Sequence, residues 1–292
     1  MKARHAELTV RGAFDLDQSR AFLDAWPAGH PGDDANGLRF TYCAPPDWTP
    51  TAVLVTARGR RLRIEASEPV TQALRDDVAR ILAVDVDGSP LAGIADRDPV
   101  VAERLREAPG LRPVHFWSTW EAACWAVLCQ RTSMRSAGVV KQRIAERTGP
   151  RVVLGGIEQA AFPSPEAVLA APSLPSVNPV KFDWIQGIAR AALDGLLDAE
   201  TLRDLPAADA LDRLQELPGV GPFSAGLILV RGAAAPDVFV TTEPRLLERM
   251  RAAYRLPSDA SPDTYATIAG AWRPLRSWVA FLLRSAATAP PP

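Results

Sequence analysis

The chain of 292 residues has few of the features that mark exported, metal-binding or membrane proteins. Its three cysteines, Cys43, Cys124 and Cys129, are too few for a disulfide framework and are not spaced as zinc or iron–sulfur ligands. No stretch reaches the roughly 18 apolar residues of a membrane-spanning helix, and no apolar segment follows the charged N-terminus as it does in a signal peptide. These absences predict a cytoplasmic protein with no membrane association and no bound metal.

Neither sign of charge is in excess, because 33 Lys and Arg residues face 34 Asp and Glu residues, for a formal net charge of -1. Chains that bind nucleic acid through a basic tail, and acidic disordered chains, have a large imbalance. The bulk charge therefore does not point to DNA. The length and the hydrophobic content of 47% predict two or three compact folded units.

Residues 1–96 have the pattern of an α+β domain. They contain short alternating runs typical of strands (7–11, 38–42, 52–56 and 61–65) and two amphipathic segments typical of helices (15–26 and 70–82). We expect an antiparallel sheet with helices packed against one face.

Residues 97–292 are dominated by helical patterns, so the chain as a whole is predicted to be mainly α. We expect a helical core of two lobes, the first at about 116–234 and the second formed by 97–115 and 235–292. Within the first lobe, Ser118 and Glu121 have the spacing of a capping box, and the residues after them are apolar on every side. This pattern predicts a fully buried helix in the first lobe.

The most informative motif is segment 217–225, Leu-Pro-Gly-Val-Gly-Pro-Phe-Ser-Ala, which lies between two helical patterns. Two glycines flank Val220, so the backbone can turn tightly and its N–H groups can approach a ligand without interference from a Cβ atom. Pro222 suits the first turn of a following helix, whose N-terminus favours anions. The turn alone fits a generic helix–helix connection as well as it fits a phosphate-binding one.

The motif and its surroundings resemble the helix-hairpin-helix DNA glycosylases, and among them the AlkA-type 3-methyladenine DNA glycosylase II group. The resemblance rests on segment 217–225, on Asp237-Val-Phe239 with a carboxylate a few residues later, and on the core helix ending in Leu128-Cys-Gln-Arg-Thr-Ser133. It covers nearly the whole chain and is most specific over residues 110–250. It implies an N-terminal sheet domain on a two-lobed helical glycosylase core, with the flipped base held between the lobes.

The resemblance also implies the activity of a monofunctional enzyme in base excision repair. Such an enzyme hydrolyses the N-glycosidic bond of an alkylated or otherwise modified purine in duplex DNA after flipping the base out of the helix. The site must supply negative charge beside an oxocarbenium-like sugar and a positioned water, and one carboxylate can supply both. The protein is expected to act on DNA as a monomer and to need no cofactor, apart from a monovalent cation that the hairpin backbone could hold.

The position of the family's catalytic aspartate is matched here by Glu243. Glutamate keeps the charge but adds a methylene group, and a misplacement of about 1 Å can cost on the order of 10²-fold in rate. A glutamate beside Pro244 is also an ordinary first-turn helix residue, stabilised by the helix dipole and without a catalytic role. We expect Glu243 to be catalytic and Asp237 not to be. Phe223 matches the strand-cutting lysine of other family members, so no lyase activity is expected.

A pocket for an electron-poor base is expected to offer aromatic faces for stacking. Phe223 is the best candidate by resemblance, and Trp117, Trp120 and Trp184 are further ones, whereas Trp125 is expected in the hydrophobic core. The pocket tryptophan of the AlkA type is matched by Arg284, which would suit a neutral base better than a cation.

The resemblance assigns two further groups of residues to DNA contacts. In the hairpin, the phosphate-binding candidates are Pro218, Gly219, Val220, Gly221 and Ser224. In the loop after the core helix, Gln130 and Arg131 match the side chains that enter the gap left by the flipped base, although an ordinary loop arginine is an equal alternative.

Two groups of basic residues border the hairpin and predict a track for the DNA backbone. They are Arg135, Lys141, Arg143, Arg147 and Arg151, and then Arg231, Arg245, Arg249 and Arg251. Two other functions remain open at this point. One is a glycosylase-fold protein that recognises damaged DNA without cutting it or with altered specificity, and the other is a hairpin scaffold that binds a repair protein.

Overall fold

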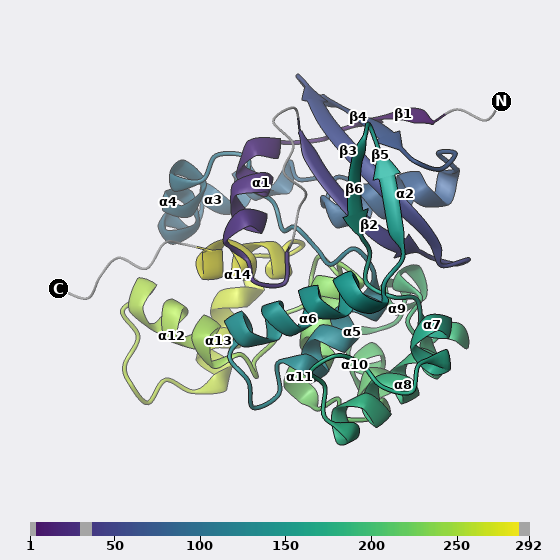
Figure 1. The fold of residues 1–292 in the computed structure, drawn as a ribbon. Helices are drawn as coiled ribbons and strands as arrows, with labels where there is room; N and C mark the ends of the chain where they lie inside the picture. Colours follow the sequence, from purple (N-terminus) through teal and green to yellow (C-terminus); the bar gives the residue numbers. More distant parts are fainter. Residues whose placement is uncertain (1–3, 30–36, 286–292) are drawn as a thin grey trace.

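A computed structural model describes residues 4–29 and 37–285 and shows a mainly helical protein with a small antiparallel sheet near the N-terminus (Figure 1). The expected fold class is confirmed. The ends of the two predicted units, residues 1–3 and 286–292, lie outside the described residues. Within the described ranges, no helix is long and apolar enough to cross a membrane.

The N-terminal sheet has the strand order β1-β4-β3-β2, and all neighbouring strands are antiparallel. Its strands are β1 (His5–Thr9), β2 (Leu38–Ala44), β3 (Thr49–Arg58) and β4 (Arg61–Ala66), and the helices α1 (Leu16–Ala25) and α2 (Gln72–Ile81) contribute to the same core. Alternate residues of the strands point into this core, so that Phe40, Val55 and Ile64 have no exposed surface.

A second hairpin, β5 (Arg151–Leu154) and β6 (Ile157–Ala160), covers the other face of the sheet. Val152 and Leu154 pack on Ala52 of β3, and Arg39 of β2 donates a hydrogen bond to the carbonyl of Leu154 at 2.9 Å. Sequence analysis did not predict this hairpin, because strands of four residues are too short for an alternating pattern to stand out. It ties the first helical lobe to the sheet domain (Figure 1).

The first helical lobe is built around α5 (Thr119–Leu128), in which every residue is buried. Ser118 caps this helix by accepting a hydrogen bond from the Glu121 N–H at 3.1 Å, as the capping-box spacing predicts. The Glu121 carboxylate itself pairs with buried Lys141 at 2.9 Å. Packed around α5 are α6 (Met134–Thr148), α7 (Pro165–Ala170), α8 (Pro179–Leu193), α9 (Ala199–Asp204), α10 (Ala207–Gln215), α11 (Pro222–Leu227) and the π-helical turn η1 (Ile228–Gly232).

The second helical lobe has its own core and contains α3 (Pro90–Ala95), α4 (Pro99–Glu107), α12 (Pro244–Ala253), α13 (Pro262–Gly270) and α14 (Arg276–Ser285). Leu91 and Ile94 of α3 are buried in this core, although the boundary expected at residue 96 would place α3 in the sheet domain. Asp98, directly before α4, connects that helix to the residues that follow α12 and α13. Its carboxylate accepts hydrogen bonds from Tyr254 at 2.6 Å and from Trp272 at 3.1 Å.

One buried arginine connects the sheet domain to the helical core. Arg80, at the end of α2, is paired with Asp77 at 3.0 Å and is 5% exposed. Its guanidinium also donates to three main-chain carbonyls, those of Phe116, Trp117 and Gly232, at 3.2, 2.7 and 2.7 Å. These carbonyls belong to the segment that enters α5 and to the end of η1, so Arg80 holds both against the sheet domain.

We predict that Arg80→Met lowers the free energy of unfolding by about 3 to 5 kcal/mol, because it leaves the buried Asp77 carboxylate without its partner. Arg104→Met is the matched control, since Arg104 forms the same i,i+3 pair with Glu107 nearer the surface, at 2.6 Å. Its loss should be below about 1 kcal/mol. Urea unfolding of the two variants measures both values, and equal losses would contradict the role of Arg80.

Candidate active site

A cavity of about 530 Å³ lies where the two helical lobes meet α1. Its volume is within the range of roughly 300 to 1,000 Å³ that small-molecule sites occupy. The walls come from α1, α5, α11, η1, α12 and α14, and six aromatic side chains border it: Phe22, Trp26, Phe116, Trp125, Phe223 and Phe281. Among the described residues around the cavity, Glu243 is the only carboxylate.

Glu243 directly precedes α12, and its carboxylate does not cap that helix. It forms an ion pair with the guanidinium of Arg284 on α14. The glutamate side chain is 20% exposed and the arginine 30%, so the pair attracts more strongly than one in open solvent. The geometry therefore gives Glu243 a place at the cavity and not the role of an ordinary helix cap.

The cavity offers no second carboxylate among the residues that the structure describes there. Cys129 borders it, but burial raises the pKa of the thiol to about 12, so the thiol is neutral at pH 7 and a poor nucleophile. Any chemistry at this site that needs negative charge must use Glu243.

Asp237, the other carboxylate of the motif, is held in a structural contact. It accepts hydrogen bonds from the backbone N–H and the Nε of Arg276 at 3.2 and 2.8 Å, and it pairs with Arg273 at 3.3 Å. It does not border the cavity. Its contacts fasten the segment before α12 to the start of α14, and these are the two elements that carry Glu243 and Arg284.

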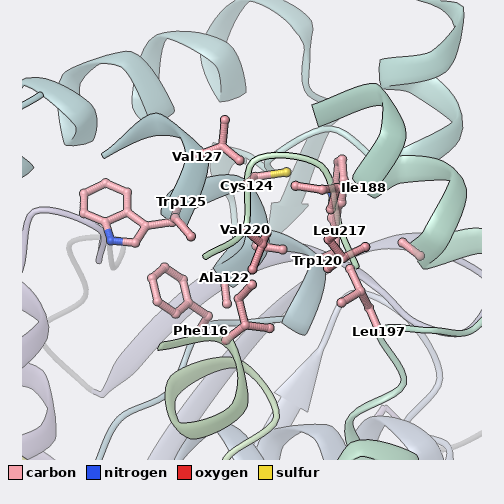
Figure 2. Close-up of a cluster of buried hydrophobic side chains, with 14 of the residues drawn as sticks. Phe116, Trp120, Ala122, Cys124, Trp125, Val127, Ile188, Leu197, Leu217 and Val220 are labelled. Carbon is pink, nitrogen blue, oxygen red and sulfur yellow. The ribbon is translucent and has the colours of Figure 1, made fainter. Parts of the chain in front are cut away.

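The aromatic candidates fall into two groups. Phe223 borders the cavity and is 46% exposed, and Trp125, the candidate expected in the hydrophobic core, is buried and borders the cavity too. The expectation that Trp117 and Trp120 belong to the pocket is wrong. Trp117 stacks on Phe40 in the sheet core with ring centroids 4.6 Å apart, and Trp120 lies across the buried cluster from Trp125 (Figure 2).

Trp184, also expected in the pocket, lies beneath the hairpin instead. Gly219 has a φ of 73°, and a Cβ atom there would lie 2.6 Å from the Trp184 ring. Pro218 packs on α8 in a similar way, because a Cβ atom at Gly187 would lie 2.6 Å from the proline ring. The turn thus rests on α8, and both contacts require glycine.

The outer part of the hairpin is open. A Cβ atom built at Gly221 meets no atom within 4 Å, whereas the Val220 side chain is buried in the first lobe. Ser224 borders the cavity. The carbonyls of Leu217 and Gly219 already accept hydrogen bonds, from the Val220 N–H at 3.1 Å and from the Gln130 amide, so a monovalent cation at the turn would have to share these oxygens.

The loop after α5 is bound to the hairpin and to α8. Gln130 borders the cavity, and its side-chain amide donates a hydrogen bond to the carbonyl of Gly219. Lys181 of α8, which sequence analysis did not single out, donates to the carbonyls of Leu128 and Gln130 at 2.8 and 2.9 Å. Arg131 is exposed and has a φ of 51°. Of the two loop candidates, Arg131 alone projects into solvent.

Arg231 is not on the predicted DNA-facing surface but borders the cavity. Its Nη2 donates to the carbonyl of Val114 at 2.6 Å. Its guanidinium lies over three aromatic rings, 4.4 Å from the centroid of Trp26 and 5.3 and 5.4 Å from those of Phe281 and Phe22. Burial, and secondarily the charge of Arg284, lowers the pKa of Arg231 to about 9, which leaves it positive at pH 7.

Lys141 is also absent from the surface, because it is 6% exposed and paired with Glu121. The other basic residues of the two groups are exposed or half-buried: Arg135, Arg143, Arg147, Arg151, Arg245, Arg249 and Arg251. The pocket aromatics Phe22 and Trp26 were missed as site residues. Their i,i+4 spacing on one helix was a usable signal, but nothing local indicates that α1 reaches the second domain.

Comparisons with known proteins agree with this architecture. No protein-family model matches the chain. It is 27% identical over 225 residues to a DNA-3-methyladenine glycosylase of Bacillus subtilis, covering 74% of each chain, and 29% identical over 174 residues to DNA-3-methyladenine glycosylase 2 of Escherichia coli, covering 58% of each. The solved structure of a 3-methyladenine DNA glycosylase from Archaeoglobus fulgidus has the same fold, with a TM-score of 0.79 over 96% of this chain and 97% of that one at 19% identity.

Proposed function

By its sequence relatives and its fold the chain is an AlkA-type helix-hairpin-helix DNA glycosylase, and on this premise we propose that it hydrolyses the N-glycosidic bond of alkylated purines in duplex DNA with Glu243 as the catalytic residue. One observation carries the assignment. Glu243 is the only carboxylate among the described residues around the aromatic cavity between the lobes.

The reaction breaks the bond between C1′ of the sugar and the base nitrogen, and the bonding electron pair leaves with the base. The sugar becomes positively charged, and a carboxylate beside it stabilises that charge. Water then adds its oxygen to C1′ and gives up a proton, which Glu243 can accept. In the free protein Arg284 neutralises Glu243. During the reaction, the positive charge on the sugar must therefore replace the guanidinium as the partner of the Glu243 carboxylate.

The proposal requires the target nucleotide to leave the duplex and enter the cavity. Several features support this route. Gly221 leaves the outer hairpin open to a phosphate. Arg131 is exposed and lies in the chain between Gln130 and Thr132, which border the cavity, so it can enter the gap left by a flipped base. The exposed arginines of α6 and α12 can follow the backbone. Phe223 occupies the place of the strand-cutting lysine, so we propose base release without strand cleavage, by a monomer.

A second function has one observation in its favour. The ion pair with Arg284 occupies Glu243, and a protein in which this pair persists on DNA would bind damaged sites without hydrolysis. Strong binding of a modified duplex with no base release would identify this alternative.

The catalytic assignment is tested by base release from duplexes that contain one methylated purine, with wild type, Glu243→Gln and Glu243→Asp. Gln has nearly the shape of Glu without its charge, so we expect a loss on the order of 10²-fold or more, while Asp retains part of the activity. Alkaline cleavage at the abasic product measures the rate. Equal rates for all three proteins would show that Glu243 is not catalytic.

The hairpin is tested by a pair of substitutions that look alike in sequence. Gly219→Ala places a Cβ atom against Trp184 at a positive φ, so we expect it to cost about 2 kcal/mol or more of stability. Gly221→Ala meets no protein atom, so its stability should change by less than about 0.5 kcal/mol.

Binding then separates the phosphate role of the hairpin from base recognition. If Gly221 faces a DNA phosphate, Gly221→Ala weakens binding to modified and unmodified duplexes by the same factor, measured by fluorescence anisotropy. A loss confined to the modified duplex would show that Gly221 contacts the modified base. An unchanged affinity for both duplexes would show that Gly221 does not contact DNA.

A further inference from the structure

The charge around the cavity is positive before any ligand enters. Glu243 and Arg284 form a pair, so their charges cancel. Arg231 has no carboxylate at ion-pair distance among the described residues, and its Nε is buried without a hydrogen-bond partner. A half-buried guanidinium whose charge has no counterion strongly affects the field in a cavity, because the surrounding protein screens it less than water does.

The same guanidinium occupies the aromatic faces that would attract a cationic base. A positive group is held by the electron-rich face of a ring at about 6 Å or less from its centroid. Arg231 lies within that distance of Trp26, Phe22 and Phe281. These three rings therefore already have a cation, and a positively charged base entering the cavity would meet a like charge beside them.

The charge of the leaving base differs between cationic and neutral substrates. A base that is cationic on the sugar departs as a neutral molecule once the electron pair moves onto its nitrogen, and it gains nothing from a nearby positive charge. A base that is neutral on the sugar departs as an anion, which then takes the proton that water has released. The described residues around the cavity include no acid that could protonate it in advance, so an unpaired guanidinium is the group able to stabilise the developing negative charge.

We propose that Arg231 determines substrate specificity, and that the cavity favours modified purines that are neutral on the sugar and carry hydrogen-bond acceptors over cationic N-alkylpurines. This inference rests on the proposed glycosylase function and specifies the charge of the base that it prefers. Arg284 does not replace Arg231 in this role, because its charge is used by Glu243. Arg245 also borders the cavity, but it is exposed, so water screens its charge more than that of Arg231.

The test compares duplexes containing one 7-methylguanine, which is cationic, with duplexes containing one 1,N6-ethenoadenine or one hypoxanthine, which are neutral. Single-turnover release by the full chain is divided by the spontaneous release rate from the same duplex, because 7-methylguanine is intrinsically labile. One unit charge at several ångströms in a partly screened site predicts an enhancement roughly 10- to 100-fold larger for the neutral bases.

Three variants assign the preference to Arg231. Arg231→Met should reduce the enhancement for neutral bases by roughly tenfold or more while sparing 7-methylguanine. Arg231→Lys, which keeps the charge, should keep the direction of the preference. Arg58→Met, which removes an exposed charge from β3, should leave the ratio unchanged. Affinity for a duplex with a stable abasic site shows whether Arg231→Met is folded. If it is not folded, the preference for neutral bases is judged from wild type and Arg231→Lys alone.

The inference is overturned if wild type enhances 7-methylguanine release as much as neutral-base release, or if a folded Arg231→Met lowers both equally, as a purely structural residue would. Release of no base at all would overturn the proposed function instead. In that case the relative affinity for the same duplexes still tests the pocket, because tighter binding to the neutral lesions is expected and tighter binding to 7-methylguanine contradicts it.

Discussion

The contact between Arg80 and the three carbonyls of Phe116, Trp117 and Gly232 is the interaction on which the cavity depends. A buried guanidinium is costly unless each of its donors and its charge have partners, and here Asp77 supplies the charge. The carbonyls that complete the arrangement belong to two walls of the cavity. Phe116 is one of its aromatic side chains, and Gly232 ends the turn that carries Arg231. The sheet domain thus stabilises the site without forming most of it.

The end of the cavity that carries Glu243 is positioned by a second set of charged contacts. Asp237 fastens the segment before α12 to the start of α14 through Arg276, and Ser277 adds hydrogen bonds to both backbone groups of Val238, at 3.0 and 2.9 Å. Glu243 and Arg284 extend from these elements and meet. Asp237 is therefore held in a structural contact, whereas Glu243, six residues later, faces the cavity. The two acids differ because they have different partners.

Much of the fold follows from local sequence, and part of the site does not. Ser118 and the all-apolar segment after it predict α5 and its burial, because capping and periodicity are properties of neighbouring residues. The hairpin turn and the position of Glu243 follow from the resemblance of contiguous motifs. The direction of a tryptophan does not follow: Trp120 and Trp125 lie on one buried helix, and only the packing of distant elements sends one into the core and the other to the cavity. The same limit hid the pairing of Glu243 with Arg284 and the place of Arg231.

The central claim is that Glu243 stabilises positive charge on the sugar, and one ratio of affinities tests it most directly. Duplexes are compared in which the target nucleotide is replaced by a protonated pyrrolidine or by neutral tetrahydrofuran, which share a ring shape and differ in charge. Wild type is predicted to bind the charged ring at least about tenfold more tightly, and Glu243→Gln to lose that preference. Equal affinity of wild type for the two rings, or a preference that persists in Glu243→Gln, would contradict the account.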